Sequence, residues 1–497
     1  MNRLSSATLR DLPASVARTS YEFDRAGIGI VHIGIGAFYR AQGAVYTDDV
    51  LARESGDWAI CGVSLRSPDV RDRLMPQDGL YTVVEKSPAG VRRRVIGSVR
   101  EVLFLGDERD LVHTRLVAAT TRIVSLTITE KGYCHDPATG RLNLGHPDIV
   151  HDLADPEHPA TAVGLLVAAL EARWCSHAKP FTVMCCDNLP HNGALVRGLV
   201  LSFANAHAPP LAQWIEENVH FPSTMVDRIV PATTDADIAE NDAALGMHDA
   251  APVMHEPFKQ WVIEDTFAAG RPAWEHAGAQ LVGNVEPFEA MKLRLLNASH
   301  SALAYLGFLA GHEFIYQVAA QPDFVAFMRA LMKEEVAPTL ALPGGVDVAA
   351  YQDALVERFR NPALPHRTQQ IAMDGSQKLP QRLLGTVRDN LAAGRSIDRL
   401  ALGVAAWMRY VAGVDEAGRA INVSDPLAED FSRIAAEHRG DPAGLARGLL
   451  DVRAVFGEDL PAAVPFARKV AAWLTALHTE GAARTVSRAA SALSVVD

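Results

Sequence analysis

The sequence changes character near residue 285, and this change limits the folds that the chain can adopt. Before it, short runs rich in valine and isoleucine alternate with longer helical patterns. Such runs are typical of strands covered on both faces, and their alternation with helices predicts a doubly wound parallel sheet. After it, strand patterns nearly vanish and alanine- and leucine-rich stretches dominate. We therefore predict a Rossmann-like α/β domain over residues 1–284 and a mostly α-helical domain over 285–497. The clearest predicted strands are 28–33, 58–65, 123–128 and 181–186, and the clearest predicted helices of the second domain are 289–309, 322–335, 348–360, 399–414 and 462–478.

Composition excludes several classes of protein. A net charge of -12 argues against non-specific binding to nucleic acid or to acidic membranes. The five cysteines form no CxxC pair, which disfavours a disulfide framework and a cysteine-based zinc site and fits a reducing compartment. The N-terminus lacks the apolar core of a signal peptide, and no apolar run is long enough to cross a bilayer. We expect a cytoplasmic protein that is a monomer or a small homo-oligomer and binds no metal.

The segment 30–41 places Gly34 and Gly36 where a predicted strand gives way to a predicted helix. Glycines here permit a tight turn and the close approach of a pyrophosphate to the helix N-terminus. The third glycine of the G-x-G-x-x-G pattern is absent, because Tyr39 stands in its place. The strand–turn–helix context still favours a dinucleotide site. A glycine-rich turn without a ligand is the alternative.

An acidic residue after the second strand should bind the ribose hydroxyls of the cofactor. The run 58–65 is followed by Arg66-Ser67-Pro68-Asp69, so Asp69 is the candidate. Its charge would favour NAD by repelling the extra phosphate of NADP, whereas Arg66 could accept that phosphate. We predict NAD, and the sequence leaves NADP open.

The segment 292–300 places Lys292, Asn297 and His300 in a run that otherwise has the pattern of a buried helix. At about 100° per residue, all three lie on one side of the helix. Burying a lysine ammonium is costly and usually lowers its pKa, so a lysine beside two hydrogen-bonding groups can act as a general base. The alternative is that Lys292 extends to solvent while His300 satisfies a hydrogen bond in the core. For this helix alone the alternative is favoured, but the rest of the chain reverses that preference.

Polar side chains follow two predicted strands at the carboxyl ends, where ligands bind in open α/β sheets. The run 123–128 leads into Thr129-Glu130-Lys131-Gly132-Tyr133, and 181–186 leads into Asp187-Asn188, where Asn188 could also serve only as a turn residue. A third polar cluster, 366–378, lies in the predicted helical domain. In this order the motifs resemble those of the mannitol dehydrogenase family, the long-chain polyol dehydrogenases that work without zinc. The segments that carry the resemblance are 34–38, 129–134, 186–188, 225–229, 256–258, 292–300 and 374–378.

The resemblance implies roles for the matching positions. Lys292 would be the catalytic acid/base, and Asn188 and Asn297 would hydrogen-bond the developing alkoxide, as in an oxyanion hole. His300 would position the reacting oxygen, and Lys378 would bind the sugar chain. The residues implied at the cofactor side are Gly34, Gly36, Ala37, Phe38, Arg40, Asp69, Asp227 and Glu130, the last being the family glutamate associated with proton movement.

The chain also departs from the mannitol-type pattern. Members usually carry histidine where this chain has Tyr39, and His-Gln where it has Gln42-Gly43. Mannitol-type enzymes have an arginine at the position of Gln370 and a glycine at that of Lys131. These two positions place the chain closer to the fructuronate reductase (D-mannonate oxidoreductase) branch. The resemblance therefore implies interconversion of D-mannonate and D-fructuronate, and the alternative is a polyol 2-dehydrogenase acting on mannitol or arabinitol.

A sugar acid differs from a polyol chiefly in its terminal carboxylate, which cationic side chains would bind. Lys131, Arg367 and Lys378 are available, with Gln370 beside them, and Arg294 is a weaker candidate. Each cation could instead be a solvated surface charge. Two other classes remain as alternatives: a nucleotide sensor on the same fold, which would have no use for an acid/base lysine, and a zinc enzyme, for which no HExxH motif is present.

Overall fold

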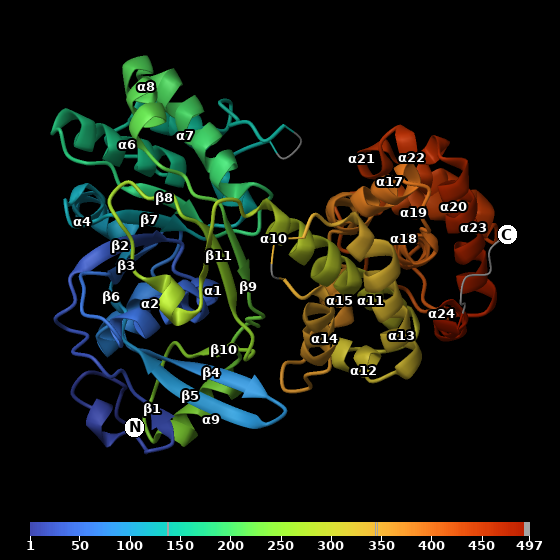
Figure 1. Cartoon of the computed structure of the whole chain (residues 1–497), viewed down its shortest axis with the longest axis horizontal. Coiled ribbons are helices and arrows are strands. Elements are labelled where there is room, and N and C mark those ends of the chain that lie inside the picture. The colour runs from blue at the N-terminus through green and yellow to red at the C-terminus, as the bar shows by residue number, and fades with distance from the viewer. Residues whose placement is uncertain (137–138, 343, 345, 492–497) are drawn as a thin grey trace. The chain divides into compact units, whose positions relative to one another are not determined.

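The computed structural model describes residues 1–136, 139–342, 344 and 346–491. The chain divides into two compact units, unit 1 (Met1–Glu286) and unit 2 (Pro287–Asp497), coloured blue to yellow-green and yellow to red in Figure 1. The predicted change of character at residue 285 lies close to this division. In the described part of the chain, no helix combines the length and apolarity needed to span a membrane.

Unit 1 is built on a parallel sheet of five strands in the order β6-β3-β2-β7-β8, so the strand order reverses direction at β2. Neighbouring strands pair in parallel along the whole sheet. This is the order of a Rossmann-like sheet, and the predicted fold class is confirmed. The strands are β2 (Ile28–Ile33), β3 (Ala59–Ser64), β6 (Val99–Phe104), β7 (Ile123–Leu126) and β8 (Thr182–Cys185).

Both faces of this sheet are covered, because side chains along each strand alternate between two apolar clusters. Val31, Ile33 and Val63 belong to a core shared with helices α4, α6, α7 and α8. Ile30 and Ile60 belong to a second core shared with α1 and α2 and with Trp261. The helices of unit 1 are α1 (Ala37–Ala41), α2 (Gly43–Leu51), α3 (Asp69–Leu74), α4 (Leu105–Val117), α5 (Pro147–Ala154), α6 (Ala162–Cys175), α7 (Asn192–His207), α8 (Pro209–Asn218) and α9 (Asp235–Leu245).

Two small sheets complete unit 1 and were not predicted. One has the order β1-β5-β4-β10 and includes an antiparallel hairpin, and the other has the order β12-β11-β9. Their strands are β1 (Val16–Ala17), β4 (Tyr81–Ser87), β5 (Gly90–Ile96), β10 (Val253–His255), β9 (Thr224–Asp227), β11 (Gln260–Glu264) and β12 (Gln280–Val282). Strand β9 follows α8 and brings Asp227 to its end.

Unit 2 is helical in its described residues, and its core is centred on α11 and α18, which pack against each other. Each of the five helical stretches predicted for this part of the chain contains a helix. Three turns are π-helical: η5 (Lys292–Asn297), η6 (Leu331–Val336) and η8 (Pro380–Leu384). The α-helices are α10 (Glu286–Met291), α11 (Ala298–Leu309), α12 (Ile315–Ala319), α13 (Pro322–Ala330), α14 (Val348–Phe359), α15 (Thr368–Ala372), α16 (Gly375–Leu379), α17 (Gly385–Ala392), α18 (Asp398–Val411), α19 (Ala428–Glu437), α20 (Pro442–Leu450), α21 (Arg453–Phe456), α22 (Asp459–Ala462), α23 (Val464–Thr479) and α24 (Ala482–Ser491).

Candidate active site

The turn between β2 and α1 has two glycines with different physical roles. Gly34 has a φ of +93°, and a Cβ there would lie 2.2 Å from the Thr127 carbonyl oxygen, so the fold itself requires glycine. At Gly36 a Cβ would meet only the Gly34 oxygen, 3.8 Å away, so the space in front of this residue is open. Gly36 caps α1, whose first residues are Ala37 and Phe38. An open approach to free N–H groups at a helix start fits the pyrophosphate of a dinucleotide.

The departures from the family pattern at Tyr39 and Gly43 are structurally coupled. Tyr39 is buried and stacks on His32, with ring centroids 3.3 Å apart and an interplanar angle of 4°. A Cβ on Gly43 would lie 2.3 Å from the Tyr39 Cε2 atom. The phenol ring therefore occupies the space that a side chain at residue 43 would need.

The other residues predicted on the cofactor side lie in three different environments. Arg40 is buried and donates to the Ala251 carbonyl over 2.7 Å, so its guanidinium is engaged within unit 1. Asp69 is exposed as the first residue of α3, and Arg66 is exposed between β3 and that helix. Asp227 is buried. The exposed positions of Asp69 and Arg66 give no preference between NAD and NADP, and these assignments stay predictions.

Asp187 organises the loop that follows β7, a role that the sequence argument did not assign to it. Its carboxylate accepts hydrogen bonds from the backbone of Ile128 (2.9 Å) and Thr129 (3.1 Å) and from the Tyr133 hydroxyl (2.6 Å). Burial raises the pKa of Asp187. Thr129 has a φ of +62°, an uncommon conformation for a β-branched residue, which these bonds hold in place. The signal in the sequence was an aspartate directly after a strand.

The loops held by Asp187 present three of the predicted site residues to solvent. Glu130 and Lys131 begin the short 3-10 helix Glu130–Tyr133 and are exposed. Asn188, next to Asp187 after β8, is also exposed. All three therefore lie at the carboxyl ends of β7 and β8, where an open α/β sheet binds its ligands.

In unit 2, the segment from Lys292 to Asn297 forms a π turn rather than the predicted regular α-helix. Residues five apart are about 140° apart around an α-helix, whereas the i to i+5 bonds of a π turn bring them to the same side. Lys292 and Asn297 therefore share a face more closely than the α-helical prediction implied. The Lys292 side chain does not extend to solvent, because the residue is only 7% exposed. Single π turns occur often at functional sites.

His300, on the helix that continues from this turn, is held as a neutral imidazole. It stacks on Phe359 with centroids 4.9 Å apart and lies 5.0 Å from the ring of His366. Its Nε2 atom is buried without a hydrogen-bond partner among the described residues. Burial lowers the pKa of His300 well below its usual value, and the neighbouring His366, Arg382 and Lys378 lower it further. A neutral imidazole can position a reacting hydroxyl as donor or acceptor.

Lys378 is fixed by the connection between α15 and α16. Its ammonium donates to the carbonyl oxygens of Met373 (2.5 Å) and Ile371 (3.4 Å). Gly375 begins α16 close against Trp407, because a Cβ there would lie 2.3 Å from the Trp407 Nε1 atom. Burial lowers the pKa of Lys378, and Arg382 contributes to the shift.

The remaining predicted substrate contacts are more exposed or already paired. Arg367 is exposed, forms an ion pair with Glu313 and lies over the Phe314 ring. Gln370 is exposed on α15. Arg294 pairs with Asp389. Their roles stay predictions, and the more buried cations near His300 include Lys378 and Arg382, of which sequence reasoning selected only the first.

One group of described side chains could hold a metal ion: Cys134, His146 and Asp148, whose potential ligand atoms lie within 4.8 Å of one another. In the structure the His146 Nδ1 atom already accepts a hydrogen bond from the Asp148 backbone. None of the residues predicted for the reaction belongs to this group.

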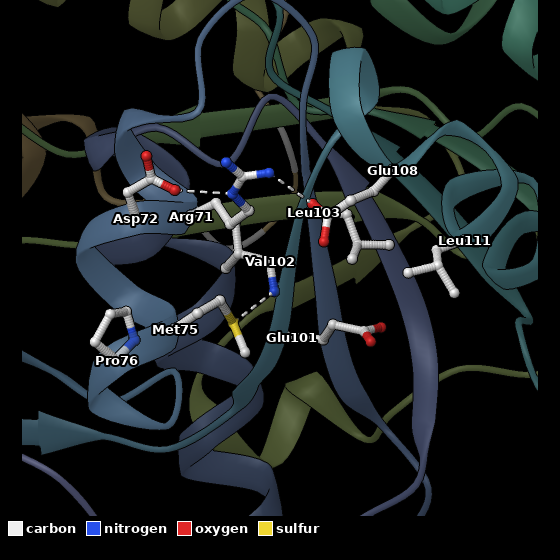
Figure 2. Close-up of a pocket in the computed structure, with 9 residues that line it drawn as sticks. All are labelled: Arg71, Asp72, Met75, Pro76, Glu101, Val102, Leu103, Glu108 and Leu111. Carbon is white, nitrogen blue, oxygen red and sulfur yellow. Dashed lines mark hydrogen bonds and ion pairs between the residues drawn. The ribbon is translucent and has the colours of Figure 1, made fainter.

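A hollow of about 570 Å³ lies beside the edge strand β6 (Figure 2). It is lined by residues of α3, of β6 and of α4, and Arg71 pairs there with Asp72 and Glu108. None of the predicted site residues is among those that line it. This hollow is therefore not the predicted reaction site.

Comparison with known proteins gives near-complete matches. The mannitol dehydrogenase Rossmann domain matches residues 28–276, and the mannitol dehydrogenase C-terminal domain matches 284–478. D-mannonate oxidoreductase of Escherichia coli is 48% identical over 97% of this chain and 99% of its own length. A mannitol 2-dehydrogenase of Phaeosphaeria nodorum is 41% identical over 98% of this chain and 85% of its own length.

Two solved structures share the fold across both units. The ternary complex of Pseudomonas fluorescens mannitol 2-dehydrogenase with NAD and D-mannitol is 42% identical, with a TM-score of 0.86, and the match covers 98% of this chain and 99% of that one. A substrate-free D-sorbitol dehydrogenase is 36% identical, with a TM-score of 0.90, over 97% of this chain and 100% of that one.

Proposed function

This chain belongs to the mannitol dehydrogenase family, and on that premise we propose that it interconverts D-mannonate and D-fructuronate as an NAD-dependent oxidoreductase. The observation that carries the choice of substrate is the nearly full-length similarity to D-mannonate oxidoreductase, at 48% identity. Lys131 and Gln370, the two positions that separate the branches, support the same choice.

Lys292 is the proposed acid/base. When bound, NAD supplies the acceptor for the hydride that leaves the substrate carbon. Neutral Lys292 takes the hydroxyl proton in oxidation, and protonated Lys292 returns it in reduction. The amides of Asn188 and Asn297 donate to the oxygen as its charge develops, and His300 orients that oxygen.

Glu130 is proposed to take part in proton movement at the site, and its exposure after β7 gives it access to solvent. Lys131 and Lys378 are the proposed cationic contacts of the sugar acid. Arg367 is a weaker candidate, because Glu313 already neutralises its charge. The proposed contacts of the cofactor are Gly34, Gly36, Ala37, Phe38, Arg40, Asp69 and Asp227.

The second candidate function is a polyol 2-dehydrogenase that converts D-mannitol to D-fructose. It is supported by the 42% identity and the TM-score of 0.86 to a mannitol 2-dehydrogenase solved with D-mannitol. The difference between the two functions lies in whether the protein binds a carboxylate or a hydroxymethyl group at the end of the substrate.

Replacing Lys292 tests the proposed chemistry. Lys292→Ala should lower kcat for D-fructuronate reduction by about 10²- to 10⁴-fold, because general acid/base catalysis contributes that much. Binding of NADH, followed by its fluorescence, should not change. Undiminished turnover in the variant would contradict the role of Lys292, and NADH binding by the wild-type protein without turnover of any sugar acid or polyol would support the nucleotide-sensor alternative.

A further inference from the structure

Arg382 is a mostly buried arginine whose charge lacks a carboxylate partner in the described part of unit 2. It lies on the π turn η8, and its Nη1 atom donates to the Ser301 hydroxyl over 2.9 Å. No ion pair of the described residues includes it. Its Nε and Nη2 atoms are not fully buried, so they remain accessible. Burying a guanidinium is costly unless its charge and its donors are satisfied.

The buried Arg173 of unit 1 shows how the hydrogen-bond donors of a structural arginine are satisfied in this chain. Its guanidinium donates to the carbonyl oxygens of Leu116, Ala118, Thr121 and Lys179. Arg382 has a single oxygen partner by comparison. Its remaining donors are therefore available to a ligand.

The neighbours of Arg382 place it at the predicted reaction site. Ser301, its hydrogen-bond partner, follows His300 directly on α11. The positive charges of Arg382 and Lys378 both lower the pKa of His300. Turn η8, which carries Arg382, packs against η5, which carries Lys292. The guanidinium thus lies in the same part of unit 2 as the proposed catalytic groups.

The charges around the two cations differ. The negative charges of Asp374 and Asp425 partly offset the lowering of the Lys378 pKa. The Asp425 carboxylate also accepts hydrogen bonds from the backbone and hydroxyl of Ser376. Burial lowers the pKa of Arg382, and no carboxylate among the described residues forms an ion pair with it. Of the two cations, Arg382 is therefore the one whose charge a bound anion would stabilise more.

We infer that Arg382 binds the terminal carboxylate of the substrate and so selects a sugar acid over a polyol. This inference rests on the proposed function and deepens it. A guanidinium can donate two parallel hydrogen bonds to a carboxylate, an arrangement that the hydroxymethyl end of a polyol cannot match in charge. Lys378 adds a second positive charge beside it.

Arg382→Gln and Arg382→Lys test this role with two substrates, D-fructuronate and D-fructose. Arg382→Gln should raise KM for D-fructuronate by about 10- to 100-fold, the value of a hydrogen bond to a charged group. KM for D-fructose should stay within about twofold, and Arg382→Lys should show an intermediate KM for the acid. Arg388→Gln is the matched control, because Arg388 lies near in sequence but pairs with Asp459, and it should change neither KM.

A wild-type measurement keeps the inference testable if the Arg382 variants do not fold. D-gluconate should compete with D-fructuronate at least about tenfold more tightly than its neutral counterpart D-sorbitol. Equal competition by acid and polyol would overturn the inference, as would an equal rise of both KM values in Arg382→Gln. If the wild-type protein turns over D-fructuronate and Arg382→Gln has an unchanged KM for it, only the inference is refuted. If the wild-type protein does not turn over D-fructuronate, the proposed function is refuted.

Discussion

At the scale of single residues, Gly34 and Gly36 form a matched pair, because one is required by the fold and the other leaves space for a ligand. Gly34→Ala should lower the free energy of unfolding by at least about 1–3 kcal/mol, the cost of a non-glycine residue in the left-handed region. Its Cβ would also clash with the Thr127 carbonyl at 2.2 Å. Urea denaturation measures this loss, and an unchanged midpoint would contradict the geometry of the turn.

Gly36→Ala should have the opposite profile. Its free energy of unfolding should fall by only about 0.5–1 kcal/mol, because alanine is a poorer helix N-cap than glycine but a Cβ there meets nothing closer than 3.8 Å. NADH affinity, measured by fluorescence titration, should fall at least about tenfold, because the methyl group occupies the approach of the pyrophosphate. Full affinity in this variant would mean that the cofactor does not approach Gly36.

Tyr39 and Gly43 should show strong coupling in a double-mutant cycle. A glycine-to-alanine change within a helix usually stabilises by about 0.5–1 kcal/mol. Gly43→Ala should instead destabilise the protein, because its Cβ would lie 2.3 Å from the Tyr39 ring. In a Tyr39→Ala background the same change should become neutral or stabilising. Additive effects in thermal unfolding would contradict the coupling.

At the scale of elements, the four apolar strands of the five-stranded sheet were predictable and β6 was not. β2, β3, β7 and β8 have continuous apolar runs because both faces of the sheet are covered. β6 has Arg100 and Glu101 in its sequence, which interrupts the apolar run, and it pairs only with β3. Charged side chains are common on edge strands, so a search for continuous apolar runs misses a strand such as β6, whereas it finds the apolar edge strand β8.

The helix that carries Lys292 was predictable as an element, but its π turn was not. The side-chain pattern of residues 292–300 fits a helix, whereas a π turn depends on which carbonyl each N–H contacts. Lys378 was predicted from the sequence, whereas Arg382 was not. Arg382 differs from Arg294 and Arg367, which pair with carboxylates, and from Arg173, whose donors are bonded to carbonyl oxygens; these differences are properties of the tertiary structure.

The stability of the protein should fall in proportion to the number of hydrogen bonds that Asp187 loses in the loop after β7. Asp187→Asn should lower the free energy of unfolding by about 1–3 kcal/mol, because an amide nitrogen would face the N–H groups of Ile128 or Thr129. Tyr133→Phe removes only one of the three donors and should cost about 1 kcal/mol. Denaturant unfolding of the two variants measures this order, and a larger loss in Tyr133→Phe would contradict it.

At the scale of the whole molecule, buried neutral histidines should make stability depend on pH. Burial lowers the pKa of His255 to about 3 and the pKa values of His32 and His300 well below their usual value. Between these values and about 6.5, the unfolded chain binds protons that the folded chain does not, so stability falls as pH falls. Each such histidine costs roughly 1.4 kcal/mol at one pH unit below 6.5.

Unfolding midpoints measured at pH 7.5 and 5.5 check this dependence. The wild-type midpoint should be lower at pH 5.5, and His255→Gln should reduce the difference between the two values. His158→Gln is the matched control, since this histidine is exposed beside Asp155 rather than buried. An equal pH dependence in the wild type and His255→Gln would contradict the contribution of His255.

The selection of a sugar acid is tested most directly by NADH oxidation with D-fructuronate and D-fructose in parallel, using the wild-type protein. A carboxylate bound by cationic side chains predicts a kcat/KM for D-fructuronate at least about 10- to 100-fold higher than that for D-fructose. Turnover of D-fructose alone would contradict it and would identify the chain as a polyol 2-dehydrogenase.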